Sequence, residues 1–147
     1  MVKYARKQQG FTLIELLIVM VILGILAALV GPRMFGKVGK SRQKGAKAQI
    51  SLFETAMDTY RLDVGKYPTT DQGLEALRVK PDDVEKWDGP YLPKEVPLDP
   101  WGNHYVYESP GEHGDYDIIS MGADGELGGE GEDADIVSWK DIGSASQ

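Results

Sequence analysis

The feature that most constrains this chain is an apolar run near its start. Residues 16–30 are all apolar or glycine, and Glu15 stands directly before them. About 20 residues of helix span roughly 30 Å, the thickness of the hydrocarbon core of a bilayer. An acidic side chain in such a segment usually has a partner. The run therefore predicts a transmembrane segment over residues 11–31, in a subunit that also packs against a surface able to satisfy Glu15.

The charges are divided unevenly between the two parts of the chain. The net charge is −7, but residues 1–50 carry nine Lys and Arg against one acid, while residues 51–147 carry seven against 22. The acidic part argues against nucleic-acid binding. The basic part lies beside the apolar run, where lipid headgroups or acidic partner surfaces are its plausible contacts. There is no cysteine, so the fold has to form without disulfides.

The residues alone leave the membrane topology open. Lys3, Arg6 and Lys7 precede the apolar run, as in a signal peptide, but the small-x-small cleavage site that should follow is poor. Six further basic residues lie between Arg33 and Lys47. Counting positive charges would therefore place the C-terminal part in the cytoplasm.

One long helix is predicted over residues 11–62, and its two halves differ. The first half is apolar on all sides. The second half is amphipathic, with Ile50, Phe53, Met57 and Tyr60 on one face. Gly and Pro residues between 31 and 45 weaken the junction between the halves, since each disfavours helix.

After a break at residues 64–68, the pattern predicts only short elements. They are a helix at 73–77, a proline-rich loop at 79–103 that ends in a turn at 99–103, strands at 105–107 and 116–120, and a last strand within 136–139. The predicted fold class is therefore α+β, with a long N-terminal helix packed on a small antiparallel sheet.

The segment Gly10-Phe11-Thr12-Leu13-Ile14-Glu15 carries the most specific signal. With a basic stretch before it and the apolar helix behind it, it resembles the processing site of the type IV pilin superfamily. The resemblance implies that residues 1–10 are a leader, which a prepilin peptidase removes between Gly10 and Phe11 before N-methylating Phe11. It also implies that Glu15 acts in assembly, and that the leader stays cytoplasmic while the globular part faces outward.

Three later segments, residues 67–77, 99–103 and 122–136, resemble the major pseudopilins of type II secretion systems. Those proteins often have Gly-Asn-Trp where this chain has Val137-Ser138-Trp139. The resemblance implies a pilin-like fold with a periplasmic globular domain over residues 63–147. It implies a single-pass inner-membrane subunit that assembles into a helical periplasmic filament, the pseudopilus, and so drives export of folded proteins across the outer membrane. Minor pseudopilins and an inner-membrane platform protein are the implied partners.

Two other functions are compatible with parts of the sequence. One is an adhesive type IV pilin, and the other is a membrane-anchored calcium-binding module that acts alone. Enzyme signatures are missing. The two histidines, His104 and His113, lack metal-ligand spacing, and neither a phosphate-binding loop nor a nucleophile elbow is present. We therefore expect a structural subunit and not an enzyme.

The acidic loop, residues 121–135, has two interpretations. Asp124, Asp133 and Asp135 lie among five glycines. The carboxylates would repel one another unless a cation lay between them, and Ca²⁺ takes carboxylate and carbonyl oxygens, but a solvated loop is equally compatible with the composition. The family resemblance implies calcium binding. It implies the side chains of Asp124, Asp133 and Asp135 as ligands, with the backbone carbonyls of Met121, Leu127 and Glu130.

Overall fold

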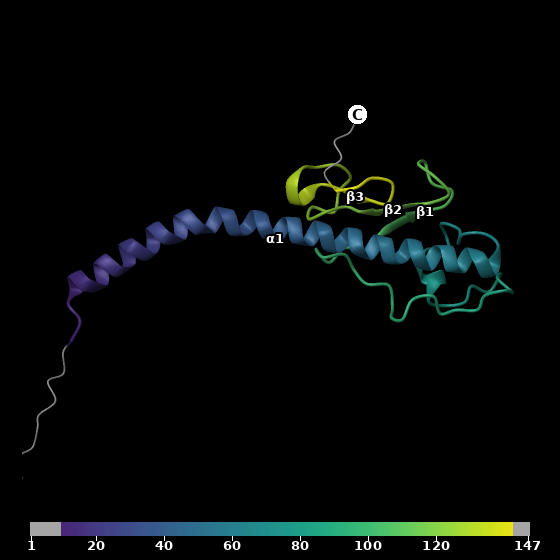
Figure 1. Ribbon diagram of the computed structural model, residues 1–147, viewed down its shortest axis with the longest axis horizontal. Helices are drawn as coiled ribbons and strands as arrows, with labels where there is room; N and C mark the ends of the chain where they lie inside the picture. The colour runs from purple at the N-terminus through teal and green to yellow at the C-terminus, as the bar shows by residue number, and fades with distance from the viewer. Residues whose placement is uncertain (1–9, 143–147) are drawn as a thin grey trace, which may run out of the picture. The chain divides into compact units, whose positions relative to one another are not determined.

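The computed structural model describes residues 10–142, apart from the side chains of residues 33–35, and Figure 1 follows the course of the chain. The chain divides into two compact units, one ending at Lys37 and the other beginning at Val38. The division falls inside helix α1 (Leu13–Val64).

Local hydrogen bonds set both ends of α1. At the start, the Thr12 amide donates to Glu15 Oε2 at 2.8 Å, and the Glu15 amide donates to Thr12 Oγ1 at 3.2 Å, which forms a capping box. At the end, Gly65 takes φ of 90° and its amide donates to the Arg61 carbonyl at 2.8 Å. The helix thus begins and ends two residues later than the predicted range of 11–62.

The N-terminal part of α1 is apolar and exposed. Every large apolar side chain from Leu13 to Val30 is at least 50% exposed. By length and composition, α1 is the one helix among residues 10–142 that could cross a membrane, and its most apolar stretch has a mean hydropathy of 3.1. The helix continues through Pro32, although proline there removes a backbone donor.

The C-terminal half of α1 supplies one wall of the core of the second unit. Ile50, Phe53, Met57 and Tyr60 are buried on one helix face, as the sequence predicts. The Phe53 ring meets the ring of Tyr105 at 5.1 Å between centroids, in an edge-to-face arrangement. Tyr60 meets Tyr91 of the proline-rich loop in the same way at 5.4 Å. The helix therefore packs against both the loop and the sheet region.

The sheet has three short antiparallel strands in the order β1-β2-β3, which lie along the C-terminal half of α1 in Figure 1. They are β1 (Val106–Glu108), β2 (Asp117–Ser120) and β3 (Ile136–Val137). Tyr107 of β1 is opposite Ile118 of β2, and Ser120 of β2 is opposite Ile136 of β3. The predicted α+β fold class is confirmed.

Short helical turns and a tight turn complete the unit. The predicted helix at 73–77 is a 3-10 helix, η1 (Leu74–Leu77), and a second one, η2 (Gly131–Asp133), lies inside the acidic loop. In the predicted turn, buried Asp99 accepts bonds from the amides of Trp101 and Asn103 at 3.0 and 2.8 Å. Ser120 Oγ donates to the other Asp99 oxygen at 2.6 Å, which fixes the turn to β2.

Candidate functional site

The predicted processing and assembly residues lie at the first turn of α1. Residues 1–9 of the predicted leader lie outside the described residues. Gly10 precedes the helix and Phe11 is 84% exposed. Glu15 Oε2 accepts hydrogen bonds from the Thr12 amide and from Thr12 Oγ1, at 2.8 and 2.9 Å. The carboxylate therefore lies at the positive end of the helix dipole and is bound within its own chain.

The three predicted metal-ligating carboxylates differ in their surroundings. Asp124 and Asp133 are exposed, and Asp124 Oδ1 accepts from the Glu126 amide at 3.1 Å. Asp135 is half-buried, and its Oδ2 accepts from the Gly128 amide at 2.8 Å. Its second oxygen, Oδ1, is buried without a hydrogen-bond partner. An orphaned carboxylate oxygen is a candidate for an unfilled coordination position.

The structure does not bring these carboxylates into one cluster. Among residues 10–142, no group of three or more acidic, His or Cys side chains is arranged to hold a metal ion. The loop backbone is nevertheless tightly folded. A Cβ on Gly122 or Gly129, which have φ of 62° and 83°, would come within 2.7 Å of the Asp133 carbonyl oxygen. The carboxylate and carbonyl oxygens of this loop are of the types that Ca²⁺ binds, and calcium binding stays a prediction.

Lys47 is a structural residue that sequence reasoning missed. Its Nζ donates to the carbonyl oxygens of Val137, Ser138 and Lys140 at 2.9, 3.2 and 2.7 Å. All three N–H donors of the ammonium group are used, which fastens the segment after the acidic loop to α1. The available signal was its position three residues before buried Ile50, at the edge of the core-facing side.

Further contacts fasten the acidic loop to the same stretch of helix. Gln43 Nε2 donates to the Gly131 carbonyl. Arg42 pairs with Glu132 at 3.7 Å, an exposed contact. Gly39 lies beneath this loop, and a Cβ there would come 2.5 Å from the Glu132 side chain, which would have to move away. The conformation of the acidic loop is therefore coupled to residues 39–47 of α1.

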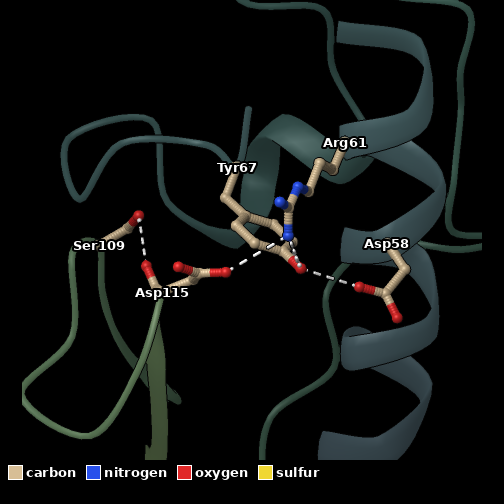
Figure 2. Close-up of polar contacts among 5 residues, drawn as sticks. All are labelled: Asp58, Arg61, Tyr67, Ser109 and Asp115. Carbon is tan, nitrogen blue, oxygen red and sulfur yellow. Dashed lines mark hydrogen bonds and ion pairs between the residues drawn. The ribbon is translucent and has the colours of Figure 1, made fainter. Parts of the chain in front are cut away.

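A polar cluster joins the other end of α1 to the loop before β2, as Figure 2 shows. Arg61 Nη1 donates to the Tyr67 hydroxyl at 3.1 Å and to Asp115 Oδ2 at 3.3 Å. The Tyr67 hydroxyl donates to Asp58 Oδ1 at 2.9 Å, and Ser109 Oγ donates to the Asp115 carbonyl at 3.2 Å. Both members of the Arg61–Asp115 pair are largely exposed, so the attraction between their charges contributes little to stability. The hydrogen bonds of the cluster position the β1–β2 loop instead.

The two histidines have different environments. His104 is exposed. His113 Nδ1 lies 2.9 Å from Asp117 Oδ2, and the imidazole stacks on the Trp139 ring with 3.8 Å between centroids. The same Asp117 oxygen accepts from the amides of Glu112 and His113. His113 therefore joins the β1–β2 loop to the C-terminal segment.

Comparison with known proteins identifies relatives along nearly the whole chain. A family model described as "Type II secretion system (T2SS), protein G" matches residues 33–139, and one described as "Prokaryotic N-terminal methylation motif" matches residues 5–31. The type II secretion system core protein G of Vibrio cholerae is 51% identical, with 93% of this chain and 95% of that protein covered. The protein of the same name from Pseudomonas aeruginosa is 47% identical, with coverage of 91% and 96%.

A solved structure is similar as well. It is the crystal structure of the major pseudopilin from the type 2 secretion system of enterohaemorrhagic Escherichia coli. The TM-score is 0.59 at 37% sequence identity, and the match covers 74% of this chain and 95% of that chain.

Proposed function

The chain belongs to the type II secretion system protein G family, and we propose that it is the major structural subunit of a periplasmic pseudopilus that drives export of folded proteins. The observation that carries this function is the presence, in one chain, of the methylation motif at residues 5–31 and the protein G match at residues 33–139. Within the superfamily, this combination favours the pseudopilus over an adhesive pilus or a module that acts alone.

The exposed apolar half of α1 is the element that supports assembly. Before assembly, this helix lies in the inner membrane, with the globular unit in the periplasm and lipid around the side chains between Leu13 and Val30. In the filament, the same side chains pack against helices of other copies. Because lipid is already apolar, these side chains gain little hydrophobic free energy when they move from lipid to a helix interface. Close packing and polar contacts between the helices favour assembly instead.

Glu15 supplies the polar contact. After cleavage between Gly10 and Phe11, the new N-methylated amine of Phe11 carries a positive charge. A carboxylate buried among apolar helices needs a partner, and the Phe11 amine of a neighbouring copy is a cation at matching depth. Prepilin peptidase, minor pseudopilins and the inner-membrane platform protein are the other partners of this cycle. The chain itself has a mechanical role and no enzymatic one.

Calcium stabilises the acidic loop in this proposal. Asp135, through its orphaned oxygen, and Asp124 and Asp133, through side chains that solvent can reach, would hold the ion together with loop carbonyls. Its chemistry there is structural, since one cation neutralises neighbouring carboxylates in a domain without disulfides.

Complementation tests the proposed function. A bacterium that has a type II secretion system but lacks its own major pseudopilin, and therefore does not export, receives this chain. Export of a folded reporter enzyme is then measured together with filament formation by electron microscopy. Restored export and short filaments are expected. Long surface fibres that do not restore export would instead indicate an adhesive pilin.

A further inference from the structure

A cavity of about 760 Å³ opens between α1 and the segments on either side of β3. Here it is called the β3 cavity. Every residue that lines it belongs to the second unit. Its apolar lining includes Ile136, Val137 and Trp139. The volume lies within the range of small-ligand sites, about 300–1,000 Å³.

Three lysines without partners border the β3 cavity. Lys40 and Lys44 reach it from α1, and Lys140 reaches it from the segment after β3. All three are exposed, and among the described residues their ammonium groups make no hydrogen bond or ion pair. Lys47 differs, since its ammonium group is fully used by backbone carbonyls. Three like charges around one cavity repel one another, so an anion between them is favoured.

Trp139 adds a hydrogen-bond donor to the same cavity. Its indole Nε1 is buried without a hydrogen-bond partner. The ring is held in place by His113, which stacks on it with 3.8 Å between centroids. A buried N–H group without an acceptor suits a ligand oxygen. Ammonium groups, an indole donor and an apolar wall together fit an anion that carries an apolar body.

Two carboxylates also border the β3 cavity, but they do not cancel its positive charge. Asp141 already has a partner of its own. Asp135 accepts from the Gly128 amide, and its second oxygen is the one that the proposed calcium ion would bind. Three lysines against two acids leave the rim positive even without that ion.

The length of chain before Lys40 keeps the β3 cavity close to the membrane. Lys40 follows the predicted transmembrane segment, residues 11–31, by nine residues. Nine residues reach at most about 30 Å in any conformation. A site tethered at that distance meets lipid headgroups at a high effective concentration, which a soluble anion lacks. Anionic headgroups also attract basic residues that follow a transmembrane segment.

We propose that the β3 cavity binds the headgroup phosphate of an anionic membrane lipid, between the ammonium groups of Lys40, Lys44 and Lys140 and beside Trp139. This inference rests on the membrane-anchored state of the proposed function. It adds a lipid site in the globular unit, outside the transmembrane segment, that holds the subunit at the bilayer before assembly.

Lysine footprinting of the full-length wild-type chain tests the site. The rate at which each lysine is acetylated is measured by mass spectrometry in neutral detergent, in phosphatidylcholine vesicles and in vesicles that also contain phosphatidylglycerol. We expect phosphatidylglycerol to slow the acetylation of Lys40, Lys44 and Lys140 severalfold. Lys94 is equally exposed but lies outside the cavity, and it should keep its rate.

Substitutions separate the cavity from general attraction to a charged surface. Lys37 and Lys40 are both exposed on α1, and Lys37 is nearer the transmembrane segment but does not line the cavity. Binding of phosphatidylglycerol to each full-length variant in neutral detergent is measured by native mass spectrometry. Lys40→Gln and Lys140→Gln should each weaken binding about fivefold, whereas Lys37→Gln should bind as the wild type does. Thermal unfolding checks that each variant is folded.

Several results would overturn the site. Equal losses for Lys37→Gln and Lys40→Gln would leave only general surface attraction. Slow acetylation of the three cavity lysines in detergent alone would show that the protein fills its own cavity. Protection by inorganic phosphate, without protection by phosphatidylglycerol, would make the ligand a soluble anion.

None of these measurements needs filament assembly, so they are independent of the complementation test. A chain that restores export but shows no lipid protection keeps the proposed function and loses the lipid site. A chain that shows the protection but does not restore export keeps the lipid site and loses the proposed function.

Discussion

The ammonium nitrogen of Lys47 lies 2.7 Å from the main-chain carbonyl oxygen of Lys140, 93 residues later in the sequence. Two more carbonyls, from Val137 and Ser138, accept from the same group. One side chain of α1 thus holds the segment that follows the acidic loop.

Replacing Lys47 should loosen that segment. A hydrogen bond from a charged donor contributes about 1.5–3 kcal/mol net, and the Lys47 contacts are partly exposed, so Lys47→Met should lower the free energy of unfolding by about 1–3 kcal/mol in all. Lys44→Met, one turn earlier and exposed, is the control. Thermal unfolding measures the loss, and amide hydrogen exchange at residues 137–141 locates it. Equal effects of the two substitutions would contradict this role for Lys47.

Asp115 and Asp117 should contribute very differently to the free energy of unfolding. Asp117 is 3% exposed and its Oδ2 accepts from two loop amides and His113, so Asp117→Ala should lower stability by about 1–3 kcal/mol because it removes the shared acceptor of these donors. Asp115 pairs with Arg61 at the surface, and Asp115→Ala should unfold close to the wild-type temperature. Chemical denaturation of both variants and of the wild type measures the two losses. Similar denaturation midpoints for the two variants would refute this prediction.

Calcium should stabilise the folded chain. At a concentration a hundredfold above Kd, a ligand that binds only the folded state adds about 2.7 kcal/mol, which corresponds to about 5–10 °C in melting temperature for a chain of this size. Calorimetry and melting curves of the full-length protein, with and without chelator, measure the effect. Asp124→Ala and Asp135→Ala should abolish it, whereas Asp82→Ala, an exposed acid outside the loop, should not. If chelator does not change the melting curve, the acidic loop does not bind calcium and is simply solvated.

Glu54 should make stability depend on pH. Burial raises its pKa, Lys47 lowers it and nearby Asp58 raises it further, with a net rise. A raised pKa means that the folded state favours the protonated carboxyl, so this contribution is present in acid and is lost as pH rises through the folded pKa. Glu54→Gln should therefore melt higher than wild type at pH 7, and the difference should close below about pH 4. Glu95→Gln, at an exposed site, should show no such difference.

Glu15 should matter for assembly and not for processing. Glu15→Val should be cleaved between Gly10 and Phe11 and inserted, because the apolar helix is unchanged, but it should assemble poorly without the carboxylate. Mass spectrometry of the mature N-terminus and filament yield are the two measurements. Normal filaments from this variant, or an intact leader in filaments of the wild type, would show that the proposed pairing is wrong.

The helix and its buried face could be predicted from the sequence because both depend on local spacing. The regular recurrence of Ile50, Phe53, Met57 and Tyr60 survives in the structure unchanged. Strand ends were less predictable. The last strand was expected within 136–139, and β3 covers Ile136–Val137 of that range. The carbonyls of Val137 and Ser138 bind Lys47, a contact that the sequence did not indicate. A contact between residues 90 positions apart leaves no periodic signal.

The predicted site residues also differ in how far the sequence alone could identify them. Gly10, Phe11 and Glu15 could be predicted as processing and assembly residues because their motif is contiguous in the chain, and the N-terminal methylation motif matches residues 5–31. Their individual roles stay predictions. The ligand set of the acidic loop depends instead on how a glycine-rich backbone folds. In the structure, Asp135 presents one free buried oxygen while Asp124 and Asp133 face solvent. The composition of the loop could indicate that oxygen ligands for a cation are present. It could not indicate whether these oxygens come together around one point.

The contact between Thr12 and Glu15 has a consequence for the moment at which a subunit leaves the bilayer. The carboxylate already accepts hydrogen bonds from the amide and hydroxyl of Thr12, so its own chain supplies donors to it before assembly. In the proposed filament, joining exchanges the Thr12 donors for the cation of a neighbouring copy, as in a ligand exchange. Thr12 is therefore expected to influence how fast subunits join, although its own contact belongs to the subunit before assembly.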